Sequence, residues 1–257
     1  MAQSVTHVDS GESLTVVVNH LKSKGSSNCD FYGDCDFGQG AYNTARTNAA
    51  LALTQWLANN PTGSVNDQVL LIGDLNSYSK EDPITALLNN GFNLVKADGG
   101  YSYVFNGETG SLDHALATPS LLSKVINVQD WHINTDEPLV LDYNTEYKSE
   151  TQIQSFYAPT PYRSSDHDPV IVDFEFNQAP VAELSVYRFL FWYIFISDSF
   201  DPDGELAAQT WQLGNYEINK EWFAVPRYLV HRQQIREVTL TVTDNDGVSD
   251  SMTQKFR

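Results

Sequence analysis

The sequence predicts an α/β domain over residues 1–176 and a small all-β domain over residues 177–257. In the first part, apolar strand-like runs alternate with helical apolar spacing, which is typical of layered α/β folds. After Asn177 there are only short strand-like runs and turns, such as the DPDG at 201–204. Alternation in VTLTV, at 238–242, predicts a half-buried strand.

The α/β part begins with two predicted strands and two predicted helices. The runs SLTVVV at 13–18 and QVLLI at 68–72 are apolar enough for buried strands. Helical spacing of apolar residues predicts a helix from about Tyr42 to Asn59, which Pro61 ends. Asp82 and Pro83 predict the start of a short helix that stops at Gly91.

Three later runs are also predicted as strands. Two of them, at 121–128 and 169–176, complete the α/β part. The third, FLFWYIFI at 189–196, is the longest apolar run of the chain and is too short to span a bilayer. We therefore expect a buried strand there and no membrane insertion.

The net charge of the chain restricts how it can bind a polyanion. There are 15 Lys and Arg residues against 33 Asp and Glu residues, which gives a net charge of −18. Such a surface repels polyphosphate at long range, so a nucleic-acid substrate requires bound metal and a local basic patch. An acidic surface also suits a protein secreted into salty surroundings, where charge is screened.

The two cysteines, Cys29 and Cys35, lie in a loop rich in Gly, Ser and Asp. A small-loop disulfide is the favoured interpretation, with free thiols as the alternative, and it indicates an oxidising compartment. The first residues lack the basic start and apolar core of a signal peptide. We expect a secreted, extracellular protein whose signal peptide is absent from this chain.

Four polar motifs each lie at an end of an apolar strand: NHLKSK at 19–24, GDLNSY at 73–78, SLDHAL at 111–116 and SSDHDPV at 164–170. Each alone has an ordinary interpretation as a strand cap, a turn or a buried polar pair. Four in one domain favour a functional site instead, because strand ends carry the chemistry of layered α/β folds. Together they offer His20, Asp74, Asn76, Asp113, His114, Asp166 and His167.

These residue types suit phosphodiester hydrolysis. Carboxylate and amide oxygens are ligands for a hard cation such as Mg²⁺ or Mn²⁺. Histidines beside carboxylates serve as acid and base near neutral pH. Hydrolysis of a phosphodiester needs both a charge-neutralising metal and a base that activates water.

The order NH, GDLN, LDH and SDHDP resembles the endonuclease/exonuclease/phosphatase superfamily, and the wider segments resemble its bacterial extracellular nucleases. The resemblance implies the C-terminal half of a DNase I-like four-layer sandwich of mixed sheets, with the N-terminal half missing. That half normally supplies a metal-binding Glu and an Asn. The exposed sheet face is therefore expected to bind the missing half or a second copy of the chain.

The resemblance also assigns roles to individual residues. His167 is the base, Asp113 orients it, and His20 is a candidate acid. Asp74 and Asn76 act in catalysis and, with Asp166, hold metal. Expected substrate contacts are Asn19, Lys22, Arg46 and His114, and for the basic residues a solvated surface is an equal alternative.

The second part resembles a PKD-type, immunoglobulin-like β-sandwich, through NQAP at 177–180, the DPDG turn, Trp211 with Gly214, and the run at 238–250. Its turn aspartates make Ca²⁺ a further candidate ion, although turn aspartates without a ligand are commoner. They are Asp201, Asp203, Asp244 and Asp246.

Taken together, the sequence predicts a metal-dependent phosphodiesterase that hydrolyses DNA or RNA. Two alternatives stay open. One is a phosphomonoesterase or phospholipid phosphodiesterase of the same superfamily, and the other is a catalytically incomplete fragment that acts as a binding or surface module.

Overall fold

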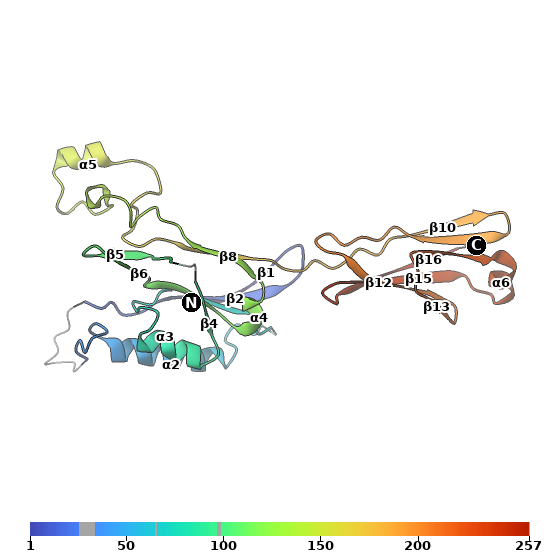
Figure 1. The fold of residues 1–257 in the computed structure, drawn as a ribbon, viewed down its shortest axis with the longest axis horizontal. Coiled ribbons are helices and arrows are strands. Elements are labelled where there is room, and N and C mark those ends of the chain that lie inside the picture. The colour runs from blue at the N-terminus through green and yellow to red at the C-terminus, as the bar shows by residue number, and fades with distance from the viewer. Residues whose placement is uncertain (26–33, 65, 97–98, 257) are drawn as a thin grey trace. The chain divides into compact units, whose positions relative to one another are not determined.

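The computed structural model describes residues 1–25, 34–64, 66–96 and 99–256 (Figure 1). The chain forms two compact units. The first comprises residues 1–6 and 13–175, and the second comprises residues 7–12 and 176–257. No helix among the described residues is long and apolar enough to cross a membrane.

A five-stranded sheet forms the centre of the first unit, in the order β1-β2-β3-β7-β4. Strands β2 and β3 run parallel, and the other neighbours run antiparallel. The parallel pair brings the ends of two predicted strands to one edge, where the NH and GDLN motifs begin. The strands are β1 (Ala2–Thr6), β2 (Ser13–His20), β3 (Val69–Asp74), β4 (Asn93–Val95) and β7 (Asp113–Ala117).

Helices α2 (Asn43–Leu57) and α3 (Asp82–Asn89) lie together on one side of this sheet (Figure 1). Pro83 stands in the first turn of α3, where its missing N–H removes no helical bond. The core between helices and sheet is apolar, so burial of this face stabilises both layers. It contains Ala50, Leu71, Leu75, Ile84, Leu87, Phe92 and Leu116.

Two antiparallel pairs and three short helices complete the described part of the first unit. The pairs are β5 (Tyr103–Phe105) with β6 (Glu108–Gly110), and β8 (Val125–Asp130) with β9 (Val170–Phe174). The short helices are α4 (Pro119–Leu122), the 3₁₀ helix η1 (Leu139–Leu141) and α5 (Glu150–Phe156). The strand predicted at 121–128 is wrong in its first half, because Pro119 starts a helical turn and the strand begins only at Val125.

The mixed α/β character of the first unit is confirmed, whereas the four-layer arrangement stays a prediction. Val18 in β2 is exposed on the sheet, and the neighbouring Val16 and Ile72 are half-buried. Self-association and pairing with a missing half both stay predictions.

The second unit consists of two antiparallel sheets with one short helix, α6 (Arg227–Arg232). One sheet contains β10 (Leu184–Phe189), β11 (Trp192–Ser197) and β14 (Trp222–Pro226). The other contains β12 (Leu206–Leu213), β13 (Tyr216–Ile218), β15 (Glu237–Asp244) and β16 (Ser249–Lys255). Its apolar core is rich in aromatic rings, among them Tyr193, Phe195, Trp211 and Phe223.

The prediction of one buried strand at 189–196 is wrong. Strand β10 ends at Phe189, the chain reverses through Leu190 and Phe191, and β11 starts at Trp192. Leu190 adopts a φ of 49°, a left-handed conformation that permits this tight reversal. Consequently the first four side chains of the run are exposed, whereas Tyr193 and Phe195 are buried.

One of the four turn aspartates of the second unit, Asp244, organises a loop. Asp244 is buried, and its carboxylate accepts hydrogen bonds from Asn177 Nδ2 and from the backbone N–H groups of Asp246 and Val248. These contacts are those of a turn-forming residue. Among the described residues, the four aspartates 201, 203, 244 and 246 do not form a cluster of close metal-type ligands, and Ca²⁺ binding stays a prediction.

Candidate active site

The GDLN motif brings the ends of β2 and β3 into close contact. Gly73 has a φ of 133°, and a Cβ at this position would lie 2.0 Å from the carbonyl oxygen of Asn19. Only glycine fits both this φ and this approach. The contact keeps His20 and Asp74 in register, and His20 Nε2 lies 3.2 Å from Asp74 Oδ2.

Asn76 fixes the carboxylate of Asp74 from the opposite end of the turn. Its backbone N–H donates to Asp74 Oδ1 at 2.7 Å, and its Nδ2 donates to Asp74 Oδ2 at 2.9 Å. The same Nδ2 also donates to the carbonyl oxygen of Leu21 at 3.1 Å. Asn76 is buried and adopts a left-handed φ of 47°, which Asn tolerates better than most residues. The turn therefore presents Asp74 in one orientation.

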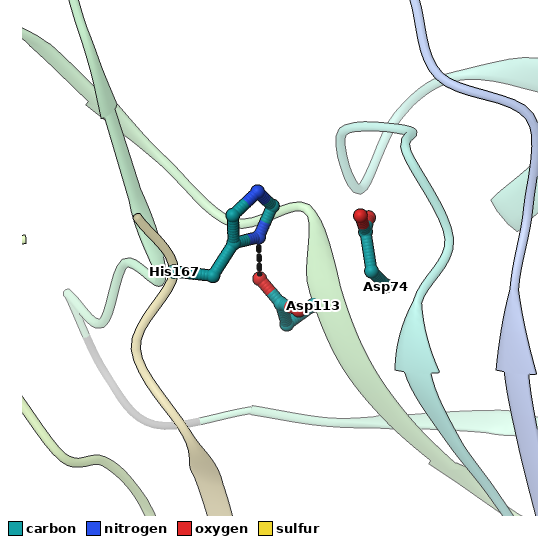
Figure 2. Close-up of side chains that lie close together, drawn as sticks. All are labelled: Asp74, Asp113 and His167. Atoms are coloured by element: carbon teal, nitrogen blue, oxygen red, sulfur yellow. Dashed lines mark hydrogen bonds and ion pairs between the residues drawn. The ribbon is translucent and has the colours of Figure 1, made fainter. Parts of the chain in front are cut away.

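His167 and Asp113 form a hydrogen-bonded pair at the ends of the SDHDP and LDH motifs. Nδ1 of His167 donates to Oδ2 of Asp113 at 2.6 Å (Figure 2). The hydroxyl of Ser102 donates to the same oxygen at 2.7 Å and accepts from the backbone N–H groups of Leu112 and Asp113. Two donors thus hold one carboxylate oxygen, and the imidazole keeps Nε2 available for chemistry.

Asn134 holds the turn that carries His167 in place through hydrogen bonds. Its Nδ2 donates to the carbonyl oxygen of His167 at 2.6 Å, and its Oδ1 accepts from the backbone N–H of Ser164 at 3.0 Å. Its backbone N–H donates to the buried carboxylate of Asp168 at 2.9 Å, and its carbonyl oxygen accepts from Arg163. Because all four polar groups of a buried residue are bonded, the turn is rigidly placed.

One ligand atom from each of Asp74, Asp113 and His167 lies within 4.8 Å of the other two. Figure 2 shows His167 and Asp113 facing each other, with Asp74 beside them. They line a hollow of about 740 Å³. The described residues that also line it include His20, Lys24, Asn76, Tyr78, Tyr103, Phe105 and Asp166.

The electrostatics of the hollow suit a cation. Burial raises the pKa of Asp74, and the charge of Asp113 raises it further. Burial opposes the charged form of His167, but the hydrogen bond and charge of Asp113, with Asp74 and Asp166, outweigh it and raise the pKa of His167. Clustered carboxylates of this kind fit a divalent cation, which relieves their mutual repulsion.

Six of the ten predicted site residues line the hollow, namely His20, Asp74, Asn76, Asp113, Asp166 and His167. The exposed Asp166 lies outside the group of three close ligands. A cation held by Asp74 and Asp113 would therefore lie farther from the carboxylate of Asp166 than from those two carboxylates.

The four predicted substrate contacts do not line the hollow. Arg46 is fully buried and donates to the carbonyl oxygens of Lys22, Gln39 and Ala41, so it braces a loop and is out of reach of a phosphate in the hollow. His114 is buried too, and its Nε2 bonds the carbonyl oxygen of Ser77 at 2.7 Å. These two assignments are corrected, because both side chains are held inside the unit.

Of the other two predicted contacts, Asn19 is half-buried and Lys22 is exposed. Nδ2 of Asn19 donates to the carbonyl oxygen of Val17. The ammonium of Lys22 donates to Ser23 Oγ and lies 4.7 Å from the ring centre of Tyr42. The predicted disulfide involves Cys29, which lies outside the described residues, and it stays a prediction.

Three residues near the site lie outside the four sequence motifs. Ser102 and Asn134 reach the catalytic pair only through tertiary contacts. Tyr103 packs against His167, with ring centres 4.6 Å apart. Tyr103 and Phe105 lie on one face of β5, and this face lines the hollow.

No protein-family model matches the sequence, and no curated protein matches it. Among solved structures, a mannosyl-6-phosphatase from Bacteroides thetaiotaomicron is 19% identical, over 66% of this chain and 54% of that chain, with a TM-score of 0.41. An endonuclease/exonuclease/phosphatase family protein from the same organism is 17% identical, over 49% of this chain and 42% of that chain, with a TM-score of 0.36.

The PKD1 domain of Vibrio anguillarum Epp is 28% identical, over 31% of this chain and 93% of that chain, with a TM-score of 0.27. The structural neighbours thus include phosphoester hydrolases and PKD domains. This chain spans only about half the length of the two phosphoesterase structures. With TM-scores below 0.5, none of these likenesses assigns a fold or an activity to the chain.

Proposed function

We propose that the first unit carries the centre of a metal-dependent phosphodiesterase that hydrolyses nucleic acid. The observation that supports this most strongly is the 2.6 Å hydrogen bond between His167 and Asp113 beside the carboxylate of Asp74. A histidine oriented by one carboxylate and facing a second, cation-binding carboxylate combines a base with a charge-neutralising site. We further propose that the protein is extracellular and that the second unit is a PKD-like module without a catalytic role.

In this proposal, His167 acts through Nε2 while Asp113 holds Nδ1. Nε2 takes a proton from water, and the water oxygen attacks the phosphorus in line with the leaving oxygen. A new P–O bond forms, the bond to the leaving oxygen breaks, and the leaving oxygen takes up a proton. His20 is the candidate donor of that proton, because its imidazole pairs with the other carboxylate of the site, Asp74.

The donor set fits Mg²⁺ or Mn²⁺. Asp74 and Asp113 offer carboxylate oxygens, and the amide oxygen of Asn76 is a further candidate ligand because its Nδ2 is engaged with Asp74. When bound, the ion would neutralise the charge that develops on the phosphate oxygens. His167 remains the base, because its Nδ1 is committed to Asp113.

Plasmid nicking tests the proposal. Purified chain is incubated with supercoiled plasmid in Mg²⁺ or Mn²⁺, with EDTA and a His167→Ala variant as controls. The proposal requires cleavage that disappears in both controls. A folded chain that cleaves neither the plasmid nor a single-stranded oligonucleotide under all conditions, or cleavage that persists in His167→Ala, contradicts it. Parallel assays with a phosphomonoester and a phospholipid test the alternative substrates.

A further inference from the structure

The catalytic hollow has an aromatic wall. Tyr103 and Phe105 lie on one face of β5, with ring centres 6.3 Å apart and ring planes 12° from parallel. Both line the hollow that contains Asp74, Asp113 and His167. The two rings have different surroundings, since Tyr103 packs against His167, whereas Phe105 is 59% exposed.

The position of Phe105 is fixed relative to the catalytic pair. Tyr103 pairs with Gly110 and Phe105 with Glu108 in the β5–β6 hairpin. The residue before this strand, Ser102, bonds both Gly110 and the carboxylate of Asp113. A Cβ at Gly110 would lie 2.5 Å from the ring of Tyr78, so this ring packs tightly against the hairpin. An exposed Phe is therefore presented to the hollow by a rigid support.

The charges around the hollow cannot supply much affinity for phosphates. Among the described residues that line it, Lys24 is the single Lys or Arg, against the four carboxylates of Asp36, Asp74, Asp113 and Asp166. The ammonium of Lys24 is already bonded to both carboxylate oxygens of Glu81, at 2.5 and 2.6 Å, and to the carbonyl oxygen of Gln39. Beyond the contribution of a bound cation, a polyanionic substrate must therefore gain its binding energy from uncharged contacts.

Stacking on an aromatic ring supplies such a contact. Every nucleobase has a flat π-face, so base–aromatic stacking is tolerant of sequence and independent of phosphate charge. The hollow, at about 740 Å³, is within the size range of sites that enclose a small organic ligand. A phosphate group has no such face, so the aromatic wall would contact the base and not the phosphate.

We infer that Phe105 is a base-stacking residue that directs this hollow toward single-stranded nucleic acid. The base must leave the stack of a duplex before it can lie on the ring, which disfavours double-stranded substrate. This inference rests on the proposed function and narrows its substrate class. Tyr103 supports the ring of Phe105 at the inner end of the wall.

Two oligomers of equal length and phosphate charge isolate the contribution of the base. One is fluorescein-labelled oligothymidylate, and the other consists of abasic tetrahydrofuran units. Binding is measured by fluorescence anisotropy with Mg²⁺ in a His167→Gln background, so that affinity is read without cleavage. Cleavage of both oligomers is measured separately with the intact His167.

The variants are Phe105→Ala, Phe105→Leu and Phe105→Trp. Leu keeps an apolar side chain without a ring, and Trp keeps the ring. Phe189→Ala is the matched control, because Phe189 is also a strand residue beside a hairpin turn, is 61% exposed and belongs to the other unit. Circular dichroism checks that each variant is folded.

Phe105→Ala and Phe105→Leu are expected to weaken oligothymidylate binding about 10-fold or more, which is typical for loss of one stacked base. Binding of the abasic oligomer is expected to change by less than about twofold, because the ring contacts no base there. Phe105→Trp is expected to retain affinity, and Phe189→Ala to change neither oligomer.

Equal weakening of both oligomers by Phe105→Ala, or no weakening, overturns the inference. So does a parent protein that binds the two oligomers equally. The proposed function fails separately, if base-dependent binding through Phe105 is present but oligothymidylate is not cleaved. Equal cleavage of both oligomers by the parent protein would support the phosphodiesterase activity and contradict the base-stacking subsite.

Discussion

His167 Nδ1 and Asp113 Oδ2 are joined by a 2.6 Å hydrogen bond across 54 residues of sequence. The bond connects β7 to the turn before β9, and Ser102 donates to the same carboxylate oxygen. Because Nδ1 is occupied, the tautomer of the neutral imidazole has its lone pair on Nε2. This one contact decides which nitrogen of His167 can act as a base.

Replacement of Asp113 by Asn is expected to lower the pKa of His167. In the intact protein the hydrogen bond and charge of Asp113, with Asp74 and Asp166, outweigh burial and raise this pKa above the usual value of about 6.5. The stabilisation that His167 contributes is present below the unfolded-state pKa and is lost as pH rises through the higher folded-state pKa. Proton NMR titration in EDTA measures the pKa directly. A pKa that does not fall in Asp113→Asn contradicts the assignment.

Removal of the Ser102 hydroxyl is expected to lower the free energy of unfolding by about 1–3 kcal/mol. Ser102→Ala leaves the buried N–H groups of Leu112 and Asp113 without their acceptor. Urea denaturation measures the change. Ser123→Ala is the control, because the Ser123 hydroxyl is bonded at the surface and its loss should change stability by less than about 0.5 kcal/mol. Equal effects of the two variants would argue against a buried role for Ser102.

Gly73→Ala is expected to destabilise the protein far more than Gly91→Ala. Both glycines have positive φ, at 133° and 93°, so both substitutions carry a conformational cost of about 1 kcal/mol or more. Only at Gly73 would the new Cβ collide with a backbone atom, the carbonyl oxygen of Asn19 at 2.0 Å. Thermal unfolding of the two variants checks this, and a Gly73→Ala protein as stable as Gly91→Ala would show that β2 and β3 can separate at no cost.

Substrate binding is expected to depend only weakly on salt. For single strands, the slope of log K against log salt is about −0.7 per phosphate contact, and the described lining of the hollow contains one Lys or Arg. We therefore expect a slope between about 0 and −1.5 for oligothymidylate. Anisotropy titrations over a range of NaCl concentrations measure it. A slope steeper than about −3 would reveal an extended basic surface that the hollow does not have.

Part of the site was predictable because its chemistry lies in short motifs at strand ends. His20, Asp74, Asn76, Asp113 and His167 all line one hollow, as the edge of a mixed sheet requires. The same local reasoning fails wherever the role of a residue depends on distant contacts. Ser102 reaches Asp113 across a hairpin, and nothing in the adjacent sequence marks it.

Burial is the second property that the sequence conceals. Arg46 resembles a phosphate-binding cation by charge alone, but its guanidinium is fully buried among carbonyl oxygens. The apolar run 189–196 likewise predicts a buried strand, whereas Leu190 and Phe191 form the exposed turn of a hairpin. An apolar run shows no alternation that would distinguish a strand from a turn.

Chemical rescue of His167→Ala tests the central claim most directly. Cleavage of oligothymidylate is measured with Mn²⁺ for the parent chain and for His167→Ala, with and without added imidazole. If His167 is the base, the variant loses at least about 100-fold in rate, and imidazole restores part of it in proportion to the concentration of its neutral form. A His167→Ala protein that cleaves at the parent rate, or one that imidazole leaves unchanged while the parent is active, would show that His167 is not the base.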